Sequence, residues 1–177
     1  RKIYVGHCKT ILEENFSNGY YMELAKKVQS IIDEEVKNDP NKLYSYDDFK
    51  KNLHESVSIG YSKIIGVEEL MKARTEYLSN HPLFNGVNPT VSETNANFSD
   101  GTAFFMANIE DAKSAWVCYR NGSNKPWKKV EMDDDGSGTW RAAAEGKVGM
   151  EYYFIAEGSR LAVCEPVRAS YDPFIIE

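Results

Sequence analysis

Three oxygen-bearing side chains in the second half of the chain have the spacing of ligands to a hard cation. Asp133, Asp135 and Ser137 alternate along the chain as at the opening of a calcium loop. The closing position of such a loop would fall on Ala144 rather than on a bidentate glutamate, and Glu145 comes one residue late. A hairpin turn in an acidic stretch explains the same residues. Asp133, Asp135 and Ser137 are therefore a candidate calcium loop, and we expect no other metal site.

The tryptophans suggest a different chemistry, because the apolar face of a pyranose ring packs on an exposed indole. In strand alternation Trp116 points away from its neighbours Ala115 and Val117. Trp127 begins another apolar run, and Trp140 falls where a β-sandwich core needs a large aromatic residue. Packing within the protein is the alternative interpretation for these rings. We retain Trp116 and Trp127 as candidate ligand-binding residues.

The other reactive side chains do not form a catalytic pattern. Three pairs of adjacent acids lie near helix ends or on solvated faces, at 34–35, 47–48 and 68–69. Acid–base catalysis needs two carboxylates in unlike environments, which these positions do not provide. The three histidines are far apart in sequence, and no nucleophile or phosphate-loop motif occurs. We expect no catalytic residue and no cofactor, so the chain as it stands is not predicted to be an enzyme.

The three cysteines, Cys8, Cys118 and Cys164, have no metal-ligand spacing and cannot all pair. A bridge between Cys118 and Cys164 is conceivable. If the two lie on strands separated by a third, however, their Cα atoms would be farther apart than the ~7 Å that a disulfide tolerates. We expect free thiols that pack as small hydrophobic groups.

The elements that position these residues change character at His81 and Pro82. Before that point apolar residues recur at three-to-four spacing, which is typical of amphipathic helices. Four helices are expected: 2–15, 20–37, one that begins at Ser45 and includes Leu53 and Val57, and one after Gly66 that ends near 80. Ser45 and Asp48 have the spacing of a capping box. The first module, 1–83, is therefore predicted to be a short helical bundle.

After Pro82 the apolar residues alternate with a period of two, and turn residues separate the runs. The candidate strands are 102–109, 114–120, 128–132, 139–143, 150–156 and 160–165, with 89–92 as a seventh at the edge. Even spacing of short strands is typical of an antiparallel β-sandwich of immunoglobulin-like type. Residues 84–177 form this second module, and the predicted fold class is α+β in two modules.

Charge and hydropathy exclude several classes of partner. The formal net charge is −6, and residues 84–177 carry nine basic against fourteen acidic side chains. Such a surface without a basic stripe disfavours nucleic acid and anionic lipid as partners. No apolar run approaches the ~20 residues that a membrane-spanning helix needs. The expected partner is a protein or a glycan.

The first module resembles the helical C-terminal end of the CotH family of spore-coat proteins, which are atypical kinases. The motifs that carry the likeness are Leu-Glu-Glu-Asn-Phe at 12–16, Ile-Ile at 31–32, Asp-Pro-Asn-Lys at 39–42, Tyr-Asp-Asp-Phe-Lys-Lys-Asn-Leu at 46–53 and Glu-Leu-Met-Lys-Ala-Arg-Thr-Glu-Tyr-Leu at 69–78. The second module resembles the immunoglobulin-like domain that often follows that kinase region in bacterial surface proteins. The residues that carry this second likeness are 117–120, Trp127, Val130, Met132, 134–136, 138–140 and 151–156.

The resemblance implies a non-catalytic C-terminal portion of a bacterial surface or secreted protein. Its helices would be the remnant of a kinase lobe, and its sandwich would serve protein interaction or spacing. The family uses ATP and a divalent metal, and the motifs that bind them lie upstream of its helical tail, so no catalytic residue is carried over. An upstream kinase core would then pack on the helical module. The alternative is a carbohydrate-binding module that uses exposed aromatic residues such as Trp116.

Overall fold

The computed structural model describes residues 1–177, which separate into two compact units. One unit contains Arg1–His7 and Pro82–Glu177, and the other contains Cys8–His81. Helices and antiparallel sheets account for the regular structure, so the predicted α+β class is confirmed. Residues 1–7 are grouped with the strands, whereas the sequence assigns them to the helical module. Val5 is buried there, with 4% of its surface exposed.

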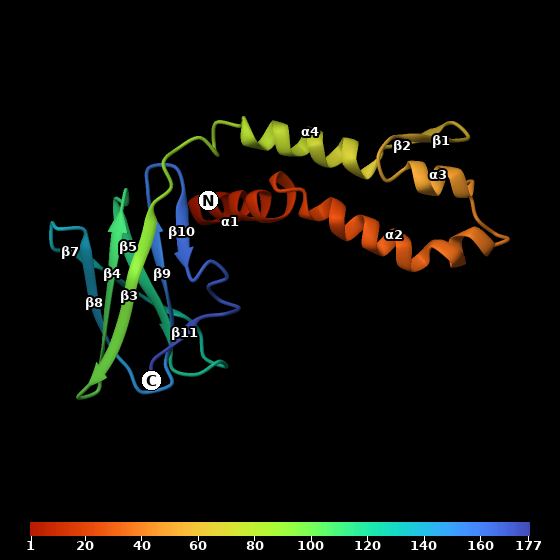
Figure 1. Cartoon of the computed structure of the whole chain (residues 1–177). Coiled ribbons are helices and arrows are strands. Elements are labelled where there is room, and N and C mark those ends of the chain that lie inside the picture. The colour runs from red at the N-terminus through yellow and green to blue at the C-terminus, as the bar shows by residue number, and fades with distance from the viewer. The chain divides into compact units, whose positions relative to one another are not determined.

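The strand-rich unit contains two antiparallel sheets, visible as two layers in Figure 1. The four-stranded sheet has the order β3-β4-β8-β7, with bounds Thr90–Ser99, Thr102–Glu110, Thr139–Glu145 and Asp133–Asp134. The five-stranded sheet has the order β10-β9-β5-β6, with bounds Ala162–Glu165, Glu151–Glu157, Ser114–Arg120 and Lys128–Glu131. The short strand β11, Phe174–Ile175, also pairs with β9.

The hydrophobic core of this unit lies between the two sheets. Phe105 on β4 and Trp140 on β8 come from one sheet, and Val117 on β5 and Phe154 on β9 come from the other. All four are buried in one cluster, as period-two alternation requires of the inward faces. The predicted inward position of Trp140 is confirmed. The two sheets therefore form a β-sandwich.

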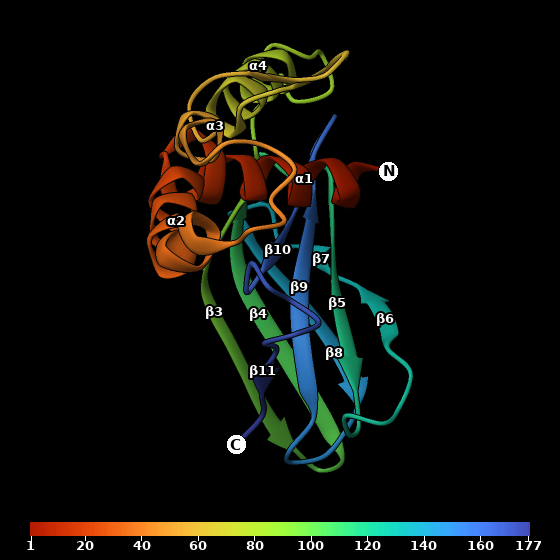
Figure 2. The same ribbon diagram turned by 90° about the vertical axis from the view of Figure 1, so that its right-hand side faces the viewer.

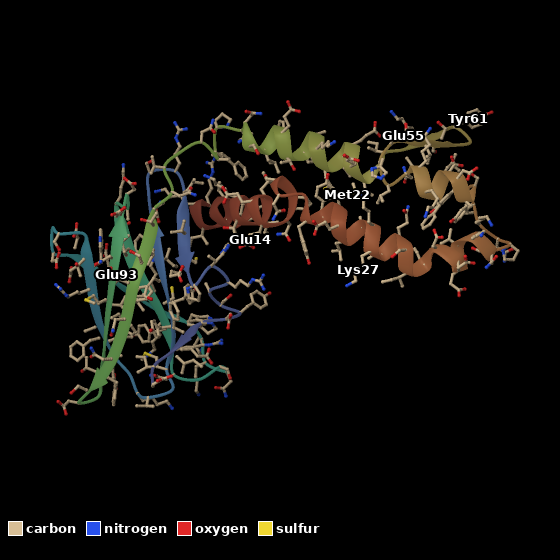
Figure 3. The ribbon with its side chains drawn as sticks, viewed as in Figure 1. Glu14, Met22, Lys27, Glu55, Tyr61 and Glu93 are labelled. Atoms are coloured by element: carbon tan, nitrogen blue, oxygen red, sulfur yellow. The ribbon has the colours of Figure 1, made fainter.

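Strand β3 is much longer than the edge strand expected at 89–92. It continues past an irregularity between Ser92 and Asn95, where Glu93 has a φ of 48°; Glu93 is labelled in Figure 3. The run from Glu93 to Asn97 is mostly polar, which suits an edge strand with one solvated face but hides it from a hydropathy pattern. Pairing with β4, rather than local propensity, extends the strand.

The helical elements follow the prediction closely in number and position. They are α1 (Lys2–Ile11), a π-helical continuation η1 (Leu12–Ser17), α2 (Tyr20–Asn38), α3 (Tyr46–Lys51) and α4 (Val67–Ser79). The division between the two units falls within α1. The capping box is confirmed, since Ser45 Oγ accepts from the Asp48 N–H at 3.0 Å.

The expected third helix is too long at its C-terminal end. The observed helix, α3, ends at Lys51. Val57, which the prediction placed in that helix, lies in a β-hairpin of β1 (Val57–Ile59) and β2 (Ser62–Ile64). Gly60 turns this hairpin with a φ of 58°, a conformation that glycine adopts without strain. Tyr61 at the turn is fully exposed and is labelled in Figure 3.

The helical unit has a small interior. Its buried apolar side chains are Leu12, Leu53 and Val57, and α2 buries none of its residues. Within this unit η1 contacts both α2 and α4, and α3 contacts α2. The four predicted helices are therefore present, but they enclose little core. None of the helices combines the length and the hydropathy that crossing a membrane would require.

Candidate functional site

The outer face of the five-stranded sheet carries a group of large side chains. Trp116 on β5 pairs with Ile155 on β9, and Cys118 pairs with Tyr153. Because directly paired residues of antiparallel strands point to the same side, these four share the face opposite the core. On the neighbouring strand β6, Glu131 pairs with Trp116 and Lys129 with Cys118. Figure 2 shows this sheet with β9 between β10 and β5.

The part of this face near β10 is covered by other segments of the same unit. Cys164 and Ala162 on β10 are buried together with Ala169, which belongs to the connection between β10 and β11. The Cys164 Sγ lies 4.0 Å from the His7 Nε2. The Lys2 ammonium donates to the Glu157 carboxylate at 2.5 Å. The part along β5 and β6 is where aromatic rings reach the surface.

Trp116 and Trp127 are both half-buried, and a cation lies over each indole. The Lys129 Nζ is 3.7 Å from the centroid of Trp116, and the Arg120 guanidinium carbon is 4.3 Å from the centroid of Trp127. Cations are attracted to the negative face of an aromatic ring. Tyr153 meets Trp127 edge-on at 4.8 Å. The outward direction predicted for Trp116 is confirmed. The fold places Trp116, Trp127 and Tyr153 together on this outer face, and we call these three rings the aromatic cluster.

A buried ion pair fixes one of these cations. The Arg120 guanidinium contacts the Glu151 carboxylate at 2.5 Å, and both side chains are largely buried, at 17% and 16% exposure. A carboxylate that accepts from an arginine in this way holds the guanidinium in one orientation. Arg120 therefore has a defined position over Trp127 rather than that of a mobile surface side chain.

The thiols of Cys118 and Cys164, on the same outer face, are free, buried and weakly acidic. Burial raises the pKa of the Cys164 thiol to about 11. Burial also raises the pKa of Cys118. Neither is a thiolate near neutral pH, which argues against a nucleophilic role. Cys118 on β5 and Cys164 on β10 are separated by β9, and the expectation of free thiols is confirmed.

Three residues of this surface, Arg120, Lys129 and Tyr153, were not singled out by the sequence analysis. Their contribution depends on which strands pair and in which register, and residues 153 and 120 come from strands that are far apart in the chain. The predicted strand at 150–156, which is rich in aromatic residues, was the one sequence signal that pointed towards Tyr153.

The candidate calcium loop is a hairpin turn in the structure. Asp135 accepts from the backbone N–H and the hydroxyl of Ser137, at 2.9 and 2.6 Å, and from the Arg141 guanidinium at 2.7 Å. These donors lower the pKa of Asp135, with the Ser137 hydroxyl as the largest cause. Asp133 lies in β7, where it pairs with Arg141. No group of three or more His, Cys, Asp or Glu side chains is placed to hold a metal ion.

No protein-family model and no curated protein sequence matches the chain. Among solved structures, similarity extends to pullulanase type I from Bacillus subtilis complexed with maltose, at 20% identity and a TM-score of 0.36, over 41% of this chain and 10% of that one. It extends also to the Br derivative of BhCBM56, at 15% identity and a TM-score of 0.37, over 48% of this chain and 88% of that one.

A third similar structure is the family 64 laminaripentaose-producing β-1,3-glucanase from Paenibacillus barengoltzii complexed with laminarihexaose. The identity is 13% and the TM-score 0.39, over 50% of this chain and 20% of that one. The chain thus spans only a small part of the two enzymes. TM-scores this low carry no functional argument, so the functional interpretation rests on the surface itself.

Proposed function

We propose that the β-sandwich is a carbohydrate-binding module whose binding surface is the outer face of β5, β6 and β9. The observation that carries the proposal is the cluster of Trp116, Trp127 and Tyr153, which reaches the surface on one face of one sheet. Flat aromatic groups on a rigid sheet match the apolar faces of sugar rings. We call this cluster, together with Arg120 and Lys129, the aromatic surface.

The polar groups around the rings suit the hydroxyls of a saccharide. The Lys129 ammonium over Trp116 is exposed and donates only. Glu131, which pairs with Trp116 across β5 and β6, supplies an acceptor. A sugar ring that stacks on Trp116 would displace the Lys129 ammonium from the face of the indole, and the displaced ammonium could donate a hydrogen bond to a hydroxyl of the same sugar. Binding of this kind needs no catalytic residue.

The test is retention on immobilised polysaccharides and titration with soluble oligosaccharides, using Trp116→Ala. Loss of the stacking face should weaken binding about tenfold or more, which corresponds to roughly 1.4 kcal/mol. Phe104→Ala is the matched control, because Phe104 is an aromatic residue 46% exposed on β4 of the other sheet. Trp116→Phe keeps a ring in the cluster and should bind with intermediate affinity. A Trp116→Ala protein that folds and binds glycans like the wild type would exclude the proposal, as would a broad panel with no retention.

An immunoglobulin-like sandwich at the surface of a bacterial cell, or secreted from it, is the setting we propose for this module. In immunoglobulin nomenclature the two strand orders read A-B-E-D and G-F-C-C′, if β3 is strand A and β10 is strand G. This order supports the immunoglobulin-like assignment. Secretion is testable by fractionating the native host cells with an antibody against the chain.

The helical unit supports a second candidate function, that of a protein-docking element. Its apolar residues line a cleft of about 440 Å³ formed mainly by α2 with Phe49, Leu53 and Val67. The α2 side chains Leu24 and Val28 are each 48% exposed. We call the exposed apolar side chains of α2 that line this cleft, Leu24 and Val28 among them, the apolar stripe. Soluble monomers rarely leave such a stripe exposed to solvent. This observation favours the CotH-like interpretation, in which a kinase core would pack on these helices.

A pair of substitutions tests whether the stripe is open. Val28→Asp should leave the helical circular-dichroism signal unchanged and lower the binding of a hydrophobic dye, because Val28 is half-exposed. Leu53→Asp should unfold the helical unit, because Leu53 is buried. If Val28→Asp unfolds the unit as well, the stripe is internal and the docking function is wrong. The kinase interpretation further requires ATP- and metal-binding motifs in the sequence encoded upstream of Arg1.

A further inference from the structure

One end of the sandwich contains a cationic pocket of about 390 Å³. It lies where β5 ends, between the connection from β5 to β6 and the connection from β8 to β9. Tyr119, Arg120, Asn121, Lys125, Pro126, Lys128 and Lys147 line it. Connections at one end of a sandwich are the usual place for a binding site on this architecture.

The pocket gathers three lysine side chains in one place, although the strand-rich unit to which it belongs carries more acidic than basic residues. Lys125, Lys128 and Lys147 are all exposed, and none of the three makes an ion pair. Residues 84–177 nevertheless carry fourteen acidic against nine basic side chains. Three unpaired ammonium groups around one hollow create a local positive potential that attracts an anion. Arg120 contributes less to this potential, because Glu151 neutralises it.

The side chain of Asn121 in the wall of the same pocket has an oxygen without a hydrogen-bond partner. The Asn121 Oδ1 is buried and has no hydrogen-bond partner, and it is the only buried side-chain nitrogen or oxygen in the chain of which this is true. Buried polar groups in folded proteins are nearly always paired. Since no hydrogen bond engages the Asn121 Oδ1, this oxygen can accept from the hydroxyl of a ligand.

The pocket adjoins the aromatic surface. Arg120 lines the pocket and also stacks on Trp127, and Pro126 in the pocket wall directly precedes that tryptophan. A chain of sugar units stacked along the aromatic surface would therefore reach the three lysines at its end. The ligand that satisfies both regions has apolar ring faces, hydroxyl groups and at least one negative charge.

We infer that the ligand is an acidic polysaccharide, with a hexuronate unit in the cationic pocket. The carboxylate would accept from Lys125, Lys128 and Lys147, and a ring hydroxyl would pair with Asn121. This inference rests on the proposed carbohydrate-binding function and narrows its ligand class. A neutral glycan leaves the three ammonium groups without a partner of opposite charge.

Calorimetric titration with trigalacturonate and with its fully methyl-esterified form tests the inference, because the two probes differ in charge and share the same rings. The wild type should bind the acid about tenfold or more tightly, since hydrogen bonds to charged groups are the stronger ones. A salt concentration of about 1 M should remove this preference, because screening then acts within ~3 Å. This measurement needs no variant and so does not depend on the folding of one.

The variant Lys125→Gln/Lys147→Gln should bind the acid and the ester with equal affinity. Lys113→Gln is the matched control, because Lys113 is an exposed lysine just before β5, at the opposite end of that strand. Equal binding of the two probes by the wild type would overturn the inference, while dependence of that binding on Trp116 would preserve the proposed function. If Trp116→Ala still binds the acid more tightly than the ester, the cationic pocket binds the ligand and the aromatic surface does not contribute to binding. Failure to bind either probe would also overturn the inference.

Discussion

At the scale of single residues, the two indoles of the aromatic surface differ in the cation that lies over each of them. The Arg120 guanidinium is fixed by Glu151, whereas the Lys129 ammonium has no ion-pair partner and is exposed. The cation over Trp127 is therefore held in place, whereas the cation over Trp116 can move away from the ring. This difference makes Trp116, rather than Trp127, the position where a sugar ring gains the most contact.

A charged cluster in the helical unit has a defined dependence on pH. Glu68 accepts from Lys72 at 2.5 Å and from His54 at 2.6 Å. These partners, Lys72 foremost, lower the pKa of Glu68 from 4.5 to about 2. A depressed carboxyl pKa stabilises the folded state fully above 4.5, and this contribution is lost as the pH falls from 4.5 towards 2.

Thermal unfolding followed by circular dichroism at neutral and acid pH checks this dependence. The wild type should lose more helical stability between these conditions than Glu68→Gln, which cannot titrate at this position. Glu35→Gln is the control, since Glu35 is an exposed acid on α2 without a salt bridge. Equal acid sensitivity of the wild type and Glu68→Gln would contradict the assignment.

At the scale of elements, the first residues of α1 are held against β10 by close backbone approach. A Cβ added to Gly6 would lie 1.9 Å from the Ala162 carbonyl oxygen, which no side-chain rotation can relieve. Helix propensity alone predicts that Gly6→Ala stabilises the protein by about 1 kcal/mol. The steric conflict is with backbone, so overpacking at a cost of about 1–3 kcal/mol opposes that gain.

We expect Gly6→Ala to lower the unfolding midpoint of the sandwich unit in denaturant titrations monitored by tryptophan fluorescence. Gly86→Ala is the matched control in the same unit, because a Cβ there would meet Arg160 at an ordinary 3.5 Å. An increase in stability for Gly6→Ala would show that residues 1–7 do not dock on β10.

At the scale of the whole molecule, the two units differ in how much apolar surface they bury. The sandwich contains an extended buried cluster that includes Phe105, Phe154 and Met150. The helical unit buries only Leu12, Leu53 and Val57. Since buried apolar contacts set local stability, the two units should open with different free energies.

Native-state hydrogen exchange measures this difference directly. Backbone amides of α2 and α4 should exchange faster, by about tenfold or more, than those of β5 and β9, because a difference of ~1.4 kcal/mol in opening free energy is a factor of ten. Addition of a docking partner to the apolar stripe would slow the α2 amides selectively. Equal protection across both units in the isolated chain would contradict the small-core description.

The amino-acid sequence by itself determined the local elements and the class of the fold. Period-two alternation identified β5 and the inward positions of Ala115 and Val117, and the Ser45 capping box identified the start of α3. These features are set by neighbours a few residues apart, so a local pattern contains them. The hairpin that contains Val57 was missed because apolar residues in short runs fit a helix as well as a strand.

Only the tertiary structure decided which side chains meet. Strand register brings Tyr153 beside Cys118 and places Trp127 between Arg120 and Tyr153. It also places Asp133 in β7 of a hairpin in which the Asp135 carboxylate already accepts from Ser137 and Arg141. The physical reason is that side-chain pairing across strands depends on contacts distant in the chain, where a shift of one residue reverses every face. The aromatic surface and the cationic pocket are products of that register.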